Sequence, residues 1–129
     1  MKNIFFIAIL CSGFFFNCTK FNTNTSVLIS AEQMLELVKF GEVQLIDVRT
    51  PNEFAKGHLH NAKNINFYDA NFDIQIDDLD KSIPVILYCK SGRRSAKCFS
   101  KLNSKGFKII YDLQGGISLW EIEGRQISN

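Results

Sequence analysis

The sequence has no strong excess of charge of either sign. The 15 Lys and Arg residues are nearly balanced by 13 Asp and Glu residues, which leaves a formal net charge of +2 at pH 7. Nucleic-acid-binding proteins typically carry a basic stripe or a basic patch interleaved with aromatic residues, and this sequence has neither. We therefore expect no nucleic-acid partner.

The apolar run at the N-terminus is too short to cross a membrane comfortably as a helix, which needs about 20 residues. It begins after Lys2 and continues through Phe16. A positive residue followed by about a dozen mostly apolar residues is typical of a secretory signal. We interpret residues 1–17 as a signal peptide.

Cys18 directly follows this run, as the lipid-modified cysteine does in bacterial lipoproteins. Asn17 departs from the usual pattern, which places a small residue before the cysteine, and Cys11 lies inside the unfinished run. Residues 18–26 are polar and are expected to form a tether. We expect an exported lipoprotein, lipidated at Cys18 and held on the periplasmic side of a membrane. A soluble periplasmic protein is the alternative.

Cysteine is scarce in the rest of the chain, where Cys89 and Cys98 are the only two. Two cysteines nine residues apart fit neither a zinc site nor a redox Cys-x-x-Cys pair. Four residues recur at the helical spacing i, i+3, i+4, i+7: Ser95, Cys98, Phe99 and Leu102. Cys98 should therefore lie on the buried face of a helix. We expect no metal, no cofactor and no disulfide between the two.

The residues around Cys89 are the most informative in the chain. An apolar run over 85–88 precedes the cysteine, and a segment with helical periodicity follows it. Cys89 should thus lie between a buried strand and a helix N-terminus, where backbone N–H groups converge and the helix dipole is positive. Three cations are close in sequence: Lys90, Arg93 and Arg94. Both effects favour the thiolate and make Cys89 a candidate nucleophile.

The loop after Cys89 is a candidate anion-binding site. Gly92 lets the backbone bend closely around a bound anion. The candidate substrate-binding residues are Lys90, Ser91, Gly92, Arg93, Arg94 and Ser95. Because the cations are local to this loop, we expect a small anionic substrate. The structural alternative is a buried strand-end cysteine followed by a basic turn.

Strand and helix signals alternate from Val27 onward. Strands are expected over 27–29, 43–48, 64–67, 85–88 and 108–111, and helices after Ser30, from Pro51, within 69–81, from the Cys89 loop to about Ser104, and over 116–123. In the first helix, Ser30 and Gln33 form a capping-box pattern. Its expected apolar face is Ala31, Met34, Leu35 and Val38. The alternation predicts a parallel sheet covered by helices on both faces, with ligands at the carboxyl ends of the strands.

Three motifs resemble those of rhodanese-like domains, in the right order and spacing. The first spans 45–54, 57–59 and 62–65, the second spans 88–95, and the third spans 113–120. The pair His60-Asn61 departs from the family pattern, where Pro-Gly is common. The resemblance implies that residues 27–129 form a three-layer α/β/α sandwich with a five-stranded parallel sheet. It also implies sulfurtransferase chemistry through a cysteine persulfide.

Under this resemblance the Cys89 thiolate attacks the outer sulfur of a donor such as thiosulfate, and sulfite leaves. A thiol or cyanide acceptor then takes the sulfur from the persulfide, so the kinetics should be ping-pong. Backbone N–H groups of the loop would hold the persulfide sulfur. Arg94 is the candidate for binding the sulfonate end of the donor, because a guanidinium fork matches a tetrahedral oxyanion.

Four residues of the first motif are candidates for supporting roles. We interpret Asp47, Arg49 and Glu53 as a strand-end ion pair or loop brace, with a cleft-facing Arg49 as the alternative. We interpret His58 as a hydrogen-bonded packing residue rather than a general base, since an activated thiolate needs none.

Two other functions share these features. Phosphatases of the same fold place five residues between their cysteine and arginine, whereas four residues separate Cys89 from Arg94. The shorter loop suits a sulfur atom better than a phosphate. A domain that only binds a partner, or relays sulfur to one, is the second alternative, and retention of Cys89 with its cations argues against an inert scaffold.

Overall fold

The fold is described from a computed structural model, which covers residues 26–129. The predicted signal peptide (1–17), the predicted lipidation of Cys18 and all but the last residue of the predicted tether (18–26) lie outside the described residues. Within residues 26–129, no helix is both long enough and apolar enough to span a membrane.

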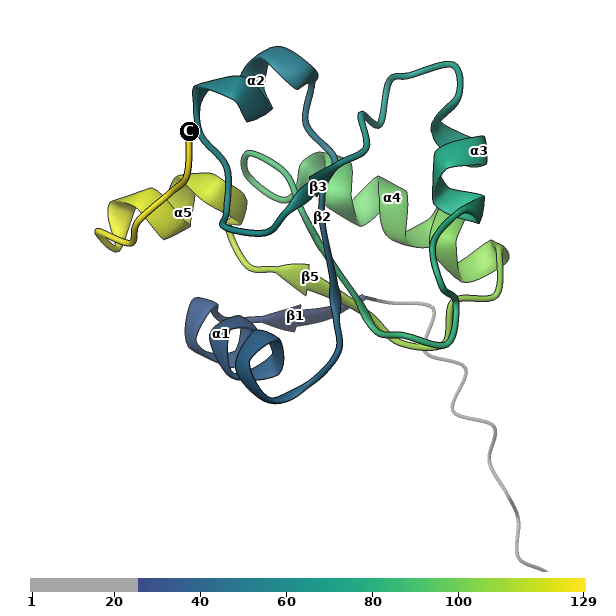
Figure 1. The fold of residues 1–129 in the computed structure, drawn as a ribbon, viewed down its shortest axis with the longest axis horizontal. Helices are drawn as coiled ribbons and strands as arrows, with labels where there is room; N and C mark the ends of the chain where they lie inside the picture. The colour runs from purple at the N-terminus through teal and green to yellow at the C-terminus, as the bar shows by residue number, and fades with distance from the viewer. Residues whose placement is uncertain (1–25) are drawn as a thin grey trace, which may run out of the picture.

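The described chain alternates strands and helices throughout (Figure 1). The strands are β1 (Val27–Ile29), β2 (Gln44–Asp47), β3 (Lys63–Asn64), β4 (Val85–Tyr88) and β5 (Ile110–Leu113). The helices are α1 (Ala31–Phe40), α2 (Pro51–Lys56), α3 (Phe72–Asp77), α4 (Arg93–Ser104) and α5 (Gly116–Ile122).

The strands of the described chain form one five-stranded sheet in the order β1-β5-β4-β2-β3, and every pairing is parallel. The prediction of a parallel sheet is therefore confirmed. Strand β4 lies at the centre, and all four of its residues are buried. A central strand that is buried on both faces has to be apolar along its whole length, which explains the run Val-Ile-Leu-Tyr.

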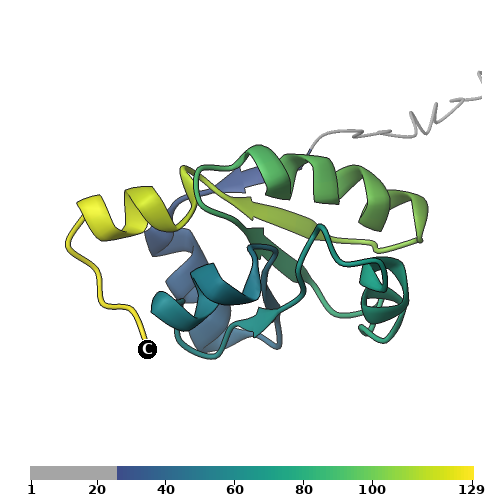
Figure 2. The same cartoon turned by 90° about the horizontal axis from the view of Figure 1, so that it is seen from above.

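Helices cover both faces of the sheet, as Figure 2 shows for α4 and α1 on opposite sides. One core lies between the sheet and helices α3 and α4 and includes Leu87, Cys98 and Leu102. The other lies between the sheet and helices α1 and α5 and includes Ile86 and Trp120. Successive residues of β4 thus point into different cores, as the two-residue period of a strand requires.

Helix α1 confirms its predicted capping box, and Gly41 caps its C-terminal end. Its predicted apolar face is only half right. Ala31 and Met34 are buried, but the side chains of Leu35 and Val38 are 45% and 38% exposed. The face toward the sheet continues instead through Leu37, which packs on the core.

Strand β2 is one residue shorter at each end than the predicted 43–48, and two other strands differ more from their predicted bounds. Strand β3 ends at Asn64, whose side-chain amide donates to the backbone carbonyls of Asp47 and Arg49, and the next inward N–H, that of Phe67, donates to the carbonyl of Val48 instead of Arg49. Strand β5 covers 110–113 rather than 108–111. Its pairing with β4 begins at Ile110, and the polar Asp112 lies inside the strand. The sequence pattern had placed the end of the strand before this aspartate.

Candidate active site

Cys89 directly follows the last residue of the central strand β4, and its side chain is buried beneath the loop that leads into α4. The loop folds back so that the backbone N–H of Gly92 donates to the Cys89 sulfur at 3.0 Å. Gly92 has a φ of 102°, in the left-handed region that an L side chain rarely adopts. The hydroxyl of Ser95 lies 3.6 Å from the same sulfur. The predicted position of Cys89, between a buried strand and a helix N-terminus, is confirmed.

Two opposing influences set the pKa of Cys89. Burial favours the neutral thiol and works to raise the pKa. Hydrogen bonds from the backbone and hydroxyl of Ser95 and from the backbones of Gly92 and Ser91 stabilise the thiolate and outweigh burial. The pKa of Cys89 is therefore below its ordinary value. The loop backbone accounts for this directly, whereas Lys90 and Arg93 extend into solvent as exposed side chains.

The turn that starts α5 supports the Cys89 loop from the other side. The backbone N–H of Ile117 donates to the carbonyl of Cys89 at 2.9 Å, and that of Ser118 donates to the carbonyl of Lys90 at 3.0 Å. A Cβ atom at Gly116 would lie 2.4 Å from the Cys89 carbonyl oxygen. Only glycine allows this approach, so the Gly-Gly pair of the third motif is part of the site.

Arg94 forms a two-pronged ion pair with Glu53 of α2. Its two terminal nitrogens each donate to one carboxylate oxygen at 2.7 Å. Glu53 also closes a capping box with Thr50. The guanidinium fork that the sequence suggested for a donor is thus engaged by a carboxylate in this structure, and Glu53 is the brace between α2 and the loop. The hydrogen bonds from Arg94 lower the pKa of Glu53 to about 2.

Asp47 and Arg49 form a second, buried ion pair at the end of β2. The Arg49 guanidinium donates to both carboxylate oxygens of Asp47 and also to the backbone carbonyl of Gly57. Arg49 also lines a cavity of about 290 Å³ beside the loop, together with Glu53 and Lys90. Arg49 therefore belongs to a strand-end ion pair and also borders the cleft, so the two roles considered for it are compatible.

His58 packs flat against Phe54, with ring centroids 3.8 Å apart. Its Nδ1 lies 3.1 Å from the backbone carbonyl of Phe54. Both contacts are with α2 and are those of a packing residue.

Sequence reasoning missed one ionisable residue at the site. Asp112 of β5 is 2% exposed, and its Oδ1 has no hydrogen-bond partner among the described residues. Burial raises the pKa of Asp112 to about 6, and an interaction with Ser95 opposes this rise. The available signal was a lone acidic residue between Tyr111 and Leu113 at the end of an apolar run.

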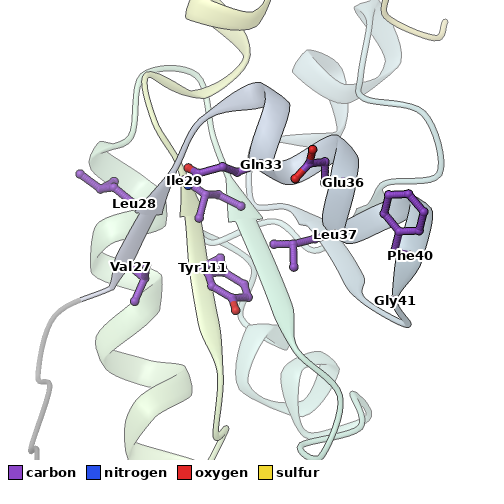
Figure 3. A pocket seen from close by; sticks show the side chains of 9 residues that line it. All are labelled: Val27, Leu28, Ile29, Gln33, Glu36, Leu37, Phe40, Gly41 and Tyr111. Atoms are coloured by element: carbon purple, nitrogen blue, oxygen red, sulfur yellow. The ribbon is translucent and has the colours of Figure 1, made fainter.

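A larger cavity of about 530 Å³ lies elsewhere, between the edge strand β1 and helix α1 (Figure 3). It is mainly apolar, and among the described residues that line it Glu36 is the only charged one. It offers no nucleophile, so we place the chemistry at Cys89. Within residues 26–129 no cluster of His, Cys, Asp or Glu is arranged to hold a metal ion.

Comparison with known proteins agrees with this geometry. Residues 30–123 match the rhodanese-like domain model. The chain belongs to the rhodanese-like domain family. It is 32% identical over 92 residues to the thiosulfate sulfurtransferase GlpE of Shewanella oneidensis, covering 71% of this chain and 89% of the relative. The GlpE protein of Ectopseudomonas mendocina is 35% identical over the same length, covering 71% and 82%.

Solved structures share the fold. A rhodanese-related protein from Thermoplasma volcanium has a TM-score of 0.70 at 28% identity and covers 79% of this chain and 97% of its own. A polysulfide-sulfur transferase homodimer from Wolinella succinogenes has a TM-score of 0.67 at 29% identity, covering 80% of this chain and 78% of its own. These likenesses confirm the rhodanese-like α/β fold with its all-parallel sheet.

The Glu53–Arg94 pair predicts a specific pH dependence of stability. Because the pKa of Glu53 is lowered on folding, its ionised form stabilises the native state above its ordinary pKa of 4.5, and that contribution is lost as pH falls toward 2. Glu53→Gln should reduce the free energy of unfolding by roughly 1 kcal/mol at pH 7, since the pair is only partly buried. The difference from the unmodified protein should shrink between about pH 4.5 and pH 2.

Urea unfolding at a series of pH values measures this difference. Glu36→Gln on the exposed side of α1 is the matched control and should change stability by less than about 0.5 kcal/mol at every pH. A Glu53→Gln effect that is the same at pH 7 and pH 2.5 would contradict the assigned ion pair.

Proposed function

We propose that the protein is a rhodanese-type sulfurtransferase that carries sulfur as a Cys89 persulfide. The observation that carries the proposal is the loop whose N–H groups surround one buried sulfur, with the Gly92 N–H at 3.0 Å. The relatives named thiosulfate sulfurtransferase support a thiosulfate-like donor. The exposed Lys90 and Arg93 add positive charge at the mouth of the site.

The proposed reaction has two half-reactions. The Cys89 thiolate attacks the outer sulfur of thiosulfate, the S–S bond of the donor breaks, and sulfite leaves with the electron pair. The new persulfide anion takes the place of the thiolate beneath the same N–H groups. An acceptor then attacks the terminal sulfur. Cyanide forms thiocyanate and a thiolate acceptor forms its own persulfide, and either returns Cys89 to the thiolate.

The first test follows the persulfide itself. Incubation with thiosulfate should add one sulfur atom, about 32 Da, to the intact mass, and cyanide or dithiothreitol should remove it. Cys89→Ser should lose this adduct and all thiosulfate:cyanide transfer, because a hydroxyl does not ionise comparably. Cys98→Ala is the matched control and should keep most activity. Loss of the adduct in folded Cys98→Ala, or its survival in Cys89→Ser, would disprove the assignment.

We further propose that Arg94 binds the sulfonate end of the donor, sharing its guanidinium between donor and Glu53. Losing a charge-assisted hydrogen bond costs about 1.5–3 kcal/mol, so Arg94→Ala should lower kcat/KM for thiosulfate tenfold or more. Arg93→Ala should lower it less. Glu53→Gln keeps the Arg94 charge and frees its fork, so it should leave kcat/KM within a few-fold of the unmodified protein.

Steady-state kinetics of these three variants separates binding from bracing. Equal large losses in Arg94→Ala and Glu53→Gln would mean that Arg94 acts only through the ion pair. Equal losses in Arg94→Ala and Arg93→Ala would mean that general positive charge, rather than the Arg94 fork, attracts the donor.

We also propose that residues 1–17 direct export and that Cys18 is lipidated, leaving residues 27–129 as the working domain. Several acyl chains on one cysteine would hold the protein firmly at a membrane, whereas one chain would not. In a lipoprotein-processing bacterium the protein should partition into detergent, and Cys18→Ala should release it or block its maturation. Recovery of the unmodified protein in the soluble periplasm, cleaved elsewhere than before Cys18, would indicate an ordinary secreted protein.

A further inference from the structure

The mechanism above leaves one buried acid unused. Asp112 lies inside β5 with its side chain almost fully buried and Oδ1 without a hydrogen-bond partner among the described residues. An ionised carboxylate in such a place is costly to folding unless it is paired. An apolar side chain at position 112 would fill the core between the sheet and α4 without this loss of folding free energy. Packing alone therefore does not account for an acid at this position.

The register of the sheet places Asp112 on the same face of the sheet as the nucleophile, on the neighbouring strand. Asp112 lies opposite Leu87 of β4, two residues before Cys89. Leu87 and Cys89 belong to the core on the α4 side, so Asp112 projects from the same face as the sulfur. Ser95 of α4 also contacts the sulfur: its hydroxyl is 3.6 Å from the Cys89 sulfur and donates to the Gly92 carbonyl at 3.2 Å.

Few other polar groups face Asp112 within the described chain. Helix α4 contributes Ser95 and the Cys98 thiol, whose pKa is raised to about 12 by burial first and by the Asp112 charge second. The charges of Lys101 on α4 and Asp73 on α3 act on Cys98 from the protein surface. The neighbouring strands contribute apolar residues, Leu87 of β4 and Leu28 of β1. The burial-raised pKa of Asp112, about 6, lets its charge change in a mildly acidic range.

We propose that Asp112 is a positioning residue that sets the basicity of the Cys89 sulfur through the charge of its buried carboxyl. This deepens the proposed function and rests on it. When Asp112 is ionised, its negative charge opposes a second negative charge on the sulfur and partly offsets the loop N–H groups. When Asp112 is protonated, this repulsion is absent and the loop N–H groups stabilise the thiolate without opposition.

The consequence is a thiolate of higher basicity than the loop alone would give. Intrinsic nucleophilicity rises with thiol pKa, with a Brønsted slope of about 0.4–0.5, and an attacking thiol works best with a pKa near the ambient pH. If the loop N–H groups stabilised the thiolate without opposition, the thiolate would be abundant at neutral pH but weakly nucleophilic. The charge of Asp112 raises the pKa of Cys89 and so makes its thiolate more nucleophilic. The burial of this carboxyl lowers the stability of the fold, and the more reactive sulfur is what the protein gains from it.

The test measures alkylation of Cys89 by iodoacetamide from pH 4.5 to 9.5, followed by peptide mass spectrometry so that other cysteines do not interfere. In Asp112→Asn the kinetic pKa of Cys89 should fall by about one unit. The rate at the high-pH plateau should fall about threefold, following the Brønsted slope. Asp73→Asn makes the same change in net charge at the surface and should alter neither quantity. An unchanged or raised pKa in folded Asp112→Asn would overturn the proposal.

A second measurement needs no variant. If Cys89 titrates alone, the logarithm of the alkylation rate rises with unit slope below its pKa. If protonated Asp112 stabilises the thiolate, the slope must fall below one across the titration of Asp112, which carboxyl-detected NMR locates directly. A unit slope through that range would overturn the proposal even if Asp112→Asn did not fold. Alkylation requires no sulfur donor, so failure of the proposed transfer reaction would be recognised separately.

Discussion

The site depends on the direction of a few backbone dipoles in the loop after β4. Because the C=O and N–H of a trans peptide point in opposite directions, turning the Ser91 N–H toward the Cys89 sulfur turns the carbonyl of Lys90 away from it, to the side where the carbonyl of Cys89 also lies. Those carbonyls accept from Ile117 and Ser118 at the start of α5, which comes close because residue 116 has no side chain. If these carbonyls were buried without hydrogen-bond donors, the fold would lose free energy comparable to that of the missing hydrogen bonds. The second and third motifs are therefore the two halves of one hydrogen-bonded unit.

Ion pairs connect the first motif to the same unit. Arg94, in the first turn of α4, is held by Glu53 of α2, and the cap at Thr50 orients that carboxylate. Asp47 holds Arg49 at the end of the neighbouring strand. Parallel strands bring all these ends to one edge of the sheet, where α/β proteins bind ligands. Positions separated by more than 40 residues of sequence thus meet around one sulfur atom because of topology, not because of local sequence.

Local patterns in the sequence predicted the elements whose causes are local. The capping box at Ser30, the helix start at Pro51, the buried run over 85–88 and the buried face of α4 through Cys98 and Leu102 all occur as predicted. The predicted apolar face of α1 and the predicted bounds of β5 were wrong, because both depend on which elements pack against them. Asp112 is the clearest case. Its burial is set by α4 and two neighbouring strands, and no window of sequence around it contains that information.

Cys89 and Cys98 provide an internal comparison of what makes a thiol reactive. Both are buried in the same core, and burial is the largest influence on each pKa. Cys98 has no set of donors to offset it, and its pKa rises to about 12, which leaves an inert thiol. Cys89 has the N–H groups of its loop, and its pKa falls below the ordinary value. Burial therefore cannot distinguish nucleophile from core residue. The direction of the surrounding N–H groups does, and a nearby buried carboxyl can then adjust how basic the activated sulfur is.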